Sequence, residues 1–599
     1  MTNATGIADK TNARGIADHT HTPAPRALGP LPDGSGVPAP VADRWRAAGL
    51  WRAGGFVHDV LRTAAAAPDR PAFTGHRAHL PAGRRSVTVS YARLALYMDR
   101  FAAALRSLGI GAGDPVALQL PNWWEAAALA LACWRIGAVV VPVLPGVRAP
   151  DLERVLTAAQ ARVCVVPDRW EEYGNAEVLA QLAHRLPWLR RRVVIGDAAA
   201  TGAVDFGTYF LRTAHERGPH GRESSLSPAG PDRPALLLNV MGMGEDHGAV
   251  LHTGNTLYAG LAAQRAEAAT EDTEEAAVPP PANPVFASPL PLTSLAGLLY
   301  TVCWPLASGG TGVLQDGWDP RVFLGLVESA RVDRVYATPA LWAELLAAQR
   351  QERRDLSGLR YALTGGRVET PEALLDELSG EFDVRVRSAW GSPEAGLGAL
   401  SYGSGKRSYG SGKRLLPGVE ATVSGGRLRV RGPSVALAAW RHGEGVEGAW
   451  GTAEGWLDTG DAAVPGRPGE VTVVGRAGER TGGLFVVPVD ELEVGLRAHP
   501  RVREAAVVEY TDATYGEMPC AVVVPALQEE PPGLVELRDH LARRGLTEAF
   551  LPTRLELVGS LPRDARGELR KEVLRTWLTR LRPGTPRRAP TAPEDPPHE

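Results

Sequence analysis

The loop at residues 239–248 reads NVMGMGEDHG and contains neither lysine nor a hydroxyl side chain. It follows an apolar segment at 235–238, which we predict to be a strand, and it precedes the sequence AVLHTGNTL. The basic side chain of this loop is His247, which is only partly cationic at pH 7 and has a shorter reach than lysine. Lysine is scarce in the whole chain, occurring only at Lys10, Lys406, Lys413 and Lys571. Few lysines therefore remain for catalytic work.

An alternation of strands and helices must position this loop. Ser90 can cap a helix on which Leu94, Met98, Phe101 and Leu105 share one face. Strands and helices then alternate, and a second such set runs from the strand before the loop to about residue 390. This pattern is typical of parallel sheets with covered faces. Short strands separated by Gly and Pro turns at 418–474 predict a small barrel or β-layer, and a compact α+β unit follows.

We therefore predict an α/β fold with four parts. Residues 1–44 form a disordered arm, 45–475 a large N-terminal domain, 476–582 a small mobile α+β domain, and 583–599 a disordered tail. The large domain should contain two layered αβ subdomains and a β-barrel-like subdomain. The tandem sequence SYGSGKR at 401–407 and 408–414 indicates a duplication in a surface loop.

Composition excludes several classes of protein. The net charge of −3 gives no electrostatic footprint for nucleic acid. The chain has no apolar run of the ~18 residues that a membrane helix requires, and its N-terminus is polar. We therefore expect a cytoplasmic protein with no membrane span and no nucleic-acid partner. The four cysteines are far apart among apolar neighbours, which predicts buried thiols; they are Cys133, Cys164, Cys303 and Cys520.

Seven stretches in a fixed order resemble the adenylate-forming superfamily, which contains acyl-CoA synthetases and other AMP-dependent ligases. They read PLPLTSLAGLLYTVCWPLASGG, YALTGGRV, SAWGSPEAG, GWLDTGD, VTVVGRAGER, HPRVREAAVVEY and LPRDARGELRK. The resemblance covers most of residues 55–580. It implies two half-reactions. A carboxylate first attacks the α-phosphate of ATP, and after rotation of the small domain a thiol attacks the acyl-adenylate.

The resemblance implies a nearly complete site for the AMP half of the nucleotide. Trp390 and Gly391 lie where an aromatic residue stacks on adenine, with Gly365 and Gly366 beside the base. Asp461 lies where a carboxylate accepts the ribose hydroxyls, and Arg476 where an arginine supports ribose and phosphate. Glu394 has the Mg²⁺-ligand position, which suits a carboxylate oxygen. The resemblance also assigns residues to the small domain, with Gly482 and Gly483 in the thiol tunnel and Gly478 at the hinge.

The positions that the resemblance assigns to ATP activation differ from the family pattern. The family's phosphate loop carries hydroxyls and a lysine, which His247 replaces here. Pro393 replaces a threonine that would donate to the α-phosphate, and proline has no N–H. Ser294 replaces a histidine near the acyl carboxylate. Glu568 lies where the adenylation lysine is expected, and its charge would repel the developing phosphate charge. Lys571, three residues later, is the one lysine that could take over.

The candidate substrate pocket includes Ser294, Leu295 and Gly297, in a stretch without charge. An amino-acid substrate would need a carboxylate for its ammonium group, so we expect a neutral or apolar carboxylic acid. The expected cofactors are AMP or ATP, Mg²⁺, and CoA or a carrier-protein thiol.

Plainer interpretations stay open for several of these residues. Trp390 and the glycines could be kept for packing alone, and Glu394 could be a solvated surface acid. Asp461 and Arg476 could form a salt bridge with each other. We interpret His247 and His252 as loop or surface histidines more readily than as catalysts.

Three functions remain consistent with the sequence. The first is a divergent acyl-CoA-ligase-type enzyme whose grip on the ATP phosphates is lost, with Glu394, Lys571 and His247 as catalytic candidates. The second is a noncatalytic homologue that binds a nucleotide or a partner protein. The third is an acyl transferase that uses a preformed acyl-adenylate. The possible partners are a small carboxylic acid or its adenylate, CoA and an acyl carrier protein.

Overall fold

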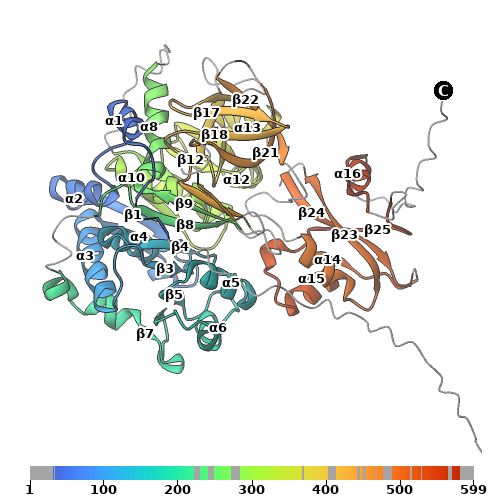
Figure 1. The fold of residues 1–599 in the computed structure, drawn as a ribbon, viewed down its shortest axis with the longest axis horizontal. Coiled ribbons are helices and arrows are strands. Elements are labelled where there is room, and N and C mark those ends of the chain that lie inside the picture. Colours follow the sequence, from blue (N-terminus) through green and yellow to red (C-terminus); the bar gives the residue numbers. More distant parts are fainter. Residues whose placement is uncertain are drawn as a thin grey trace, which may run out of the picture.

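The structure is a computed structural model in which three sheets organise the chain (Figure 1). It describes residues 31–32, 34–221, 229–240, 248–270, 283–366, 370, 372–401, 413–441, 445–448, 454–465, 467, 469–476, 489–512, 516–527, 529–563 and 569–580. Within these residues the sheets have 13, nine and three strands. The predicted α/β fold, with a large N-terminal part and a small C-terminal unit, is confirmed.

The nine-stranded sheet has the order β20-β19-β9-β8-β4-β3-β5-β6-β7. Its strands are β3 (Pro115–Leu118), β4 (Val139–Pro142), β5 (Val163–Pro167), β6 (Arg191–Ile195), β7 (Val204–Asp205), β8 (Pro234–Val240), β9 (Gly248–Thr253), β19 (Ala438–Arg441) and β20 (Gly445–Gly448). The helix that precedes β3 is α3 (Tyr91–Ser107), and those that connect β3 to β6 are α4 (Trp124–Ile136), α5 (Ala149–Ala159) and α6 (Asn175–Leu182). The strands from β3 to β7 run parallel, as the strand–helix alternation predicts.

The 13-stranded sheet has the order β17-β18-β21-β22-β16-β15-β14-β13-β12-β10-β11-β1-β2. Its strands are β1 (Pro71–His76), β2 (Ser86–Ser90), β10 (Val285–Ala287), β11 (Thr311–Gln315), β12 (Arg334–Ala337), β13 (Tyr361–Gly366), β14 (Arg385–Ser392), β15 (Gly396–Ser401), β16 (Lys413–Leu415), β17 (Glu420–Ser424), β18 (Arg427–Arg431), β21 (Leu457–Pro465) and β22 (Glu470–Arg476). The strands at 420–476 thus extend this sheet, except for β19, which pairs with β9 in the other sheet, and β20, which pairs with β19.

The remaining helices of the large part surround these two sheets. They are α1 (Ala39–Ala47), α2 (Phe56–Ala66), α8 (Gly254–Thr270), α9 (Leu295–Leu298), α10 (Trp304–Ala307), α11 (Pro320–Ser329), α12 (Pro339–Gln351) and α13 (Glu372–Phe382). Short helical turns of this part are η1 (Ala82–Arg84), η2 (Ala183–Arg185), η3 (Ala199–Thr201), η4 (Gly207–Arg212), η5 (His215–Arg217) and η6 (Leu299–Cys303), whereas η7 (Glu548–Phe550) lies in the C-terminal unit. The expected disordered arm extended to residue 44, but α1 begins at Ala39, because Ala42 and Trp45 bury one side of this helix.

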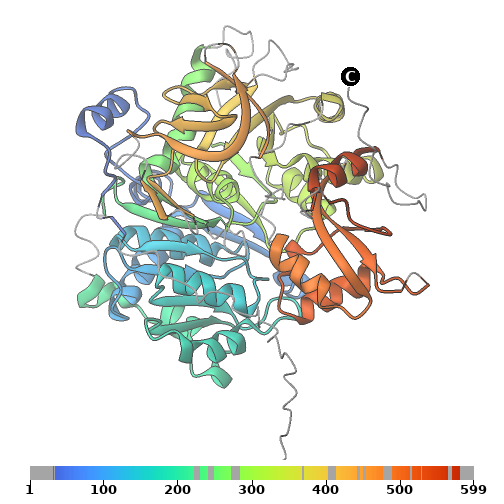
Figure 2. The same cartoon turned by 45° about the vertical axis from the view of Figure 1, so that its right-hand side comes forward.

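The C-terminal unit is a three-stranded sheet covered by three helices. It contains α14 (Val489–Arg497), β23 (Val502–Asp512), β24 (Gly516–Pro525), α15 (Leu534–Arg543), β25 (Arg554–Leu557) and α16 (Lys571–Arg580). Figures 1 and 2 show this unit, in orange and red, beside the large part near α5. The contact is direct: the Thr547 hydroxyl donates to the Asp151 carboxylate on α5 at 2.7 Å, and both residues are buried.

Several local predictions are confirmed. Ser90 caps α3 by accepting a hydrogen bond from the Arg93 amide, and the predicted apolar face of that helix is fully buried. The four cysteines are free and buried. Burial raises the pKa of each thiol, to about 12 for Cys520. Within the described residues, no helix is long and apolar enough to cross a membrane.

Candidate functional site

The candidate nucleotide site lies where the 13-stranded sheet curls over. Trp390 on β14 and Asp461 on β21 are separated by β15, β16 and β22 in the order of the sheet. In a flat sheet, four strand spacings would put these two strands about 19 Å apart. Yet the indole Nε1 donates to the Asp461 carboxylate at 3.2 Å. The end of the sheet therefore folds back on itself, which is the barrel-like geometry expected of residues 418–474.

Asp461 is held inside this curl. Its side chain is fully buried, and its amide donates to the Thr459 hydroxyl at 3.1 Å. The Thr459 hydroxyl in turn donates to the Leu428 carbonyl at 2.9 Å on β18. Asp461 pairs in register with Arg476 on β22, and the structure describes Arg476 through its backbone. The salt bridge between their side chains therefore stays one interpretation of the sequence.

Trp390 is only 1% exposed, so a base could stack on its ring only if neighbouring groups moved. Gly398 on β15 makes room for the indole, since a Cβ at this position would lie 2.3 Å from the ring. Gly391 also lies close to the hairpin partner, because a Cβ there would lie 2.7 Å from the Gly396 carbonyl oxygen. The sequence analysis did not single out Gly398, and a small residue opposite a large aromatic one is the signal that could have found it.

Glycine is required at Gly365, at the carboxyl end of β13. Its φ is +130°, and a Cβ would lie 2.1 Å from the Ala389 carbonyl on β14. The buried Tyr336 hydroxyl donates to the Gly365 carbonyl at 3.1 Å. Gly366 pairs in register with Trp390. The two predicted glycines therefore lie beside the predicted aromatic residue, and a close approach between backbones explains the first of them.

Glu394 lies in the turn between β14 and β15 and is 4% exposed. It is therefore not the solvated surface acid that was one interpretation of the sequence. Pro393, just before it, presents its carbonyl to the imidazole Nε2 of His252 at 2.7 Å. Within the described residues, no cluster of three or more His, Cys, Asp or Glu could hold a metal ion alone. A carboxylate at Glu394 suits a Mg²⁺ ion that brings its other ligands with nucleotide phosphates, as this ion commonly does.

His252 corrects an expectation, because it is neither a loop nor a surface residue. It lies on β9 and is fully buried. Every residue of this strand from Ala249 to Thr253 is buried. A strand covered on both faces has no polar alternation, so its sequence gave no sign that the histidine at its end points inward. Burial lowers the pKa of His252 to about 4.

The segment before η6 contains the predicted pocket residues. The Ser294 hydroxyl caps α9 by accepting from the Gly297 amide at 3.1 Å, and it donates to the Pro291 carbonyl at 2.8 Å. Leu295 is buried, and a Cβ on Gly297 would lie 2.1 Å from the Pro291 carbonyl. Asn122 bridges this segment by donating to the Leu290 carbonyl and accepting from the Leu292 amide. Ser294 and Gly297 thus have local structural roles.

The remaining predicted site residues lie away from the curled sheet or outside the part of the chain that the structure describes. Lys571 begins α16, and its Nζ lies 3.1 Å from the Glu493 carboxylate on α14. His247, Gly478, Gly482, Gly483 and Glu568 lie outside the described residues.

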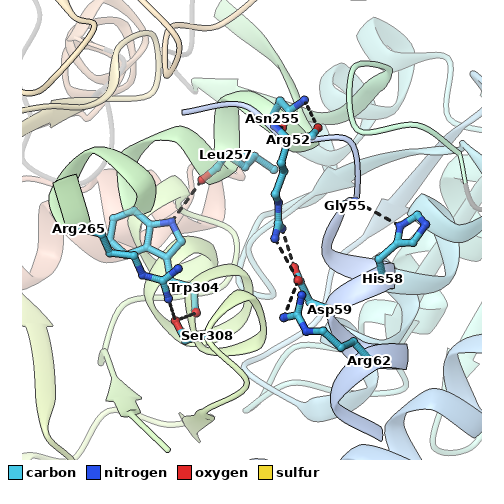
Figure 3. Close-up of polar contacts among 10 residues, drawn as sticks. All are labelled: Arg52, Gly55, His58, Asp59, Arg62, Asn255, Leu257, Arg265, Trp304 and Ser308. Carbon is cyan, nitrogen blue, oxygen red and sulfur yellow. Dashed lines mark hydrogen bonds and ion pairs between the residues drawn. The ribbon is translucent and has the colours of Figure 1, made fainter. Parts of the chain in front are cut away.

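An arginine cluster fixes the beginning of α8, the helix that follows β9 (Figure 3). Asn255 accepts a hydrogen bond from the Arg52 amide and donates to the Arg52 carbonyl, both at 3.0 Å. Arg52 pairs with Asp59 through two hydrogen bonds, and Arg62 contacts the same carboxylate. Burial raises the pKa of Asp59, although both arginines oppose that shift. The cluster connects α2 to α8, so it holds the end of β9 in place.

Comparison with known proteins gives family models and relatives of one kind, AMP-binding enzymes that are ligases of carboxylic acids. The model of the AMP-binding enzyme family matches residues 60–438, and that of the AMP-binding enzyme C-terminal domain matches 491–568. The chain is 27% identical to a medium-chain fatty-acid–CoA ligase of Escherichia coli, over 90% of this chain and 92% of the relative. It is also 27% identical to a 2,3-dihydroxybenzoate-AMP ligase of Bacillus subtilis, over 90% of this chain and 97% of the relative.

Among solved structures, the amide bond synthetase McbA of Marinactinospora thermotolerans shares the fold, with a TM-score of 0.67 at 24% identity. The alignment covers 88% of this chain and 99% of that one. The family model alone spans more than half of the chain. The chain therefore belongs to the AMP-binding enzyme family, the adenylate-forming group that its motifs resemble.

Proposed function

We propose that this protein is a divergent AMP-dependent acyl ligase that forms a thioester from an acyl-adenylate and has little capacity to make that adenylate from ATP. The observation that carries the proposal is the β14–β15 turn. Buried Glu394 is kept there, whereas Pro393 has no N–H and its carbonyl is engaged by His252. The Glu394 carboxylate in this turn can hold a metal ion that binds phosphate. Pro393 cannot donate a hydrogen bond to the α-phosphate, because proline has no N–H.

The AMP half of the nucleotide is favoured by the residues around this turn. Asp461 is a buried carboxylate beside Trp390, and Gly365 brings the backbone of β13 close to β14. In the family these positions contact ribose and adenine. A buried carboxylate that accepts two hydroxyls is worth more than one at the surface, because hydrogen bonds to charged groups contribute roughly 1.5–3 kcal/mol each.

The side chains that would activate ATP are replaced in this chain or paired with other residues. The loop at 239–248 has no lysine, serine or threonine. Lys571, the one lysine near the expected position, pairs with Glu493, and the two side chains are 8% and 9% exposed. Glu493 also accepts from the Val507 amide at 2.8 Å, so the pair belongs to the interior of the C-terminal unit. Each missing electrostatic group typically costs ~10²–10³ in rate.

The acyl group that we propose is neutral or apolar. The segment 289–300 carries no charge, and Leu295, Leu298 and Leu299 are buried in it. The relatives in the comparison are named for a medium-chain fatty acid and for 2,3-dihydroxybenzoate. Neither acid carries an ammonium group, which agrees with a pocket that has no carboxylate in this segment.

The proposed step is acyl transfer to a thiol of CoA or of a carrier protein. The thiolate sulfur attacks the carbonyl carbon of the acyl-adenylate and forms the C–S bond. The bond from that carbon to the phosphate oxygen breaks, and AMP leaves with the electron pair. The thiol proton goes to solvent. Mg²⁺, when bound by Glu394 and the phosphate, would neutralise charge on the leaving AMP.

Two reaction mixtures test the proposal over the same panel of neutral carboxylic acids. One contains synthetic acyl-adenylate and CoA, and the other contains ATP, the free acid and CoA. We expect thioester from the first mixture only. Thioester from ATP at ordinary rates would contradict the loss of activation, and Lys571→Met would then show whether this lysine compensates. Thioester from neither mixture would favour a noncatalytic homologue. Glu568→Lys alone should not restore adenylation, because the loop would still lack its hydroxyls.

A further inference from the structure

The turn that carries Glu394 is held at three successive carbonyls by groups distant in sequence. The Pro393 carbonyl accepts from the His252 imidazole at 2.7 Å, and the Glu394 carbonyl accepts from the Ala436 amide at 2.8 Å. The Ala395 carbonyl accepts from the Ser434 hydroxyl at 2.9 Å. In most surface turns such carbonyls bind water. Here protein groups outside the turn bind all three, so they hold its backbone in place.

His252 is the one side chain from the nine-stranded sheet among these three donors. It lies at the end of β9, and its Nδ1 is 3.0 Å from the Thr256 hydroxyl on α8. A carbonyl can only accept, so Nε2 carries the proton. Nδ1 of the neutral ring lies within hydrogen-bonding distance of the Thr256 hydroxyl, whose single proton it shares with the Thr253 carbonyl at 3.0 Å. Both ring nitrogens are therefore engaged, and the ring has a defined orientation.

The support for the ring continues into the core. Asn255, next to Thr256, is anchored to the backbone of Arg52 (Figure 3). The Leu251 carbonyl on β9 accepts from the Leu437 amide at 2.8 Å, in the same segment that supplies Ala436 and Ser434. The three donors thus belong to one connected framework, and His252 is its direct link to Pro393.

We propose that His252 is a positioning residue for the Glu394 carboxylate, through the hydrogen bond that it donates to the Pro393 carbonyl. The inference rests on the proposed function for its consequence, since it assigns Glu394 to the metal and phosphate of the nucleotide. It does not make His252 a catalytic residue, because the ring is buried and both of its nitrogens are used within the protein. A carboxylate must be held closely to act on a bound ion, and this bond supplies part of that constraint.

Hydrogen exchange on the free protein tests the positioning without any ligand. The variants are His252→Phe, which removes both hydrogen bonds, and His252→Gln, whose amide can still donate. The control is Trp134→Phe, which removes a comparable buried bond from the indole Nε1 to the Ala235 carbonyl at 2.8 Å, away from the turn. We expect peptides that span 388–398 to exchange at least ~10-fold faster in His252→Phe and less so in His252→Gln. Trp134→Phe should leave that exchange unchanged.

Calorimetric titration with AMP, in MgCl₂ or in EDTA, tests the consequence. Glu394→Gln should abolish the effect of Mg²⁺ on AMP affinity, and His252→Phe should reduce it. In the double variant, His252→Phe should add nothing to Glu394→Gln, because it acts through that carboxylate.

Unchanged exchange at 388–398 in a folded His252→Phe protein would overturn the proposal, and so would additive losses in the double variant. If His252→Phe does not fold, the same comparisons are made with His252→Gln. A wild-type protein that shows no AMP binding would contradict the proposed function, and the exchange experiment would still decide the positioning role.

Discussion

Glu394 and Lys571 are both buried charged residues in the predicted catalytic set, and their surroundings differ. Glu394 lies in a turn whose backbone is held by donors from β9 and from the segment before β19, close to the Trp390–Asp461 pair. Lys571 lies inside the C-terminal unit, where its ammonium group pairs with Glu493. The framework around the residues that we assign to the AMP half is thus built into the core, whereas the lysine that could serve the phosphate is paired with a structural partner.

This difference separates the two half-reactions in physical terms. A group that neutralises phosphate charge must be free to reach the nucleotide, and an ion pair in a nearly buried site opposes that movement. A group that binds ribose or supports a metal gains from being fixed beforehand. We expect experiments on the two regions to diverge accordingly, and the following predictions run from the largest expected effect to the smallest.

Asp461→Ala should abolish AMP binding. The variant removes the buried acceptor that we assign to the ribose hydroxyls, and a loss of at least ~100-fold would put binding below detection by calorimetry. Asp461→Asn keeps the size of the side chain and covers the case in which alanine does not fold. The control is Asp458→Ala, on the same strand, whose carboxylate pairs with Arg427 nearer the surface. Normal AMP binding in both Asp461 variants would remove the ribose role.

Lys571→Met should destabilise the C-terminal unit by about 3 kcal/mol, because the nearly buried Glu493 then keeps only its longer contact with Arg497, at 3.6 Å. Thermal unfolding and limited proteolysis would both report the loss. Arg575→Met is the matched control on the same helix, since its pair with Glu509 is about 30% exposed and should be worth at most ~1 kcal/mol. A stable Lys571→Met protein that selectively lost ATP-dependent activity would instead make this lysine catalytic.

The free energy of unfolding should decrease as the pH is lowered, and part of that decrease should depend on His252. Burial lowers the pKa of this ring in the folded protein to about 4, while the unfolded chain has an ordinary histidine near 6.5. Below pH 6.5 the imidazole therefore binds a proton in the unfolded chain but not in the folded protein. Folding stability is lost as the pH falls toward 4. The full effect is on the order of 3 kcal/mol. His252→Gln should lose less stability than wild type over this range, as measured by melting temperature at pH 7 and pH 4.5. An equal drop in melting temperature for wild type and His252→Gln would contradict the role of His252 in this pH dependence.

Thr547→Val should weaken the contact between the C-terminal unit and α5 by about 1–2 kcal/mol, because the buried Asp151 carboxylate loses the hydroxyl that donates to it. Thr547→Ser keeps the hydroxyl and is the control. Small-angle scattering would detect a larger mean radius for the valine variant. Identical scattering from both variants would show that this hydrogen bond does not hold the units together.

The sequence was a good guide wherever one element determines its own structure. The Ser90 cap and the apolar face of α3 follow from spacing within 17 residues, and the burial of the cysteines follows from their apolar neighbours. The site depended on what the sequence does not encode locally. Trp390 meets Asp461 across a curled sheet, 71 residues along the chain. His252 is buried because β8, β9 and β19 pair around it, and no periodicity in β9 signals that arrangement.

The relative affinity of AMP and ATP tests the central claim most directly. Calorimetric titration of the wild-type protein with each nucleotide in MgCl₂ would measure it. We propose that the residues for ribose and adenine are kept and those for the triphosphate are replaced, so AMP should bind at least as tightly as ATP. If ATP bound about tenfold or more tightly than AMP, the protein would have a phosphate grip that this account denies.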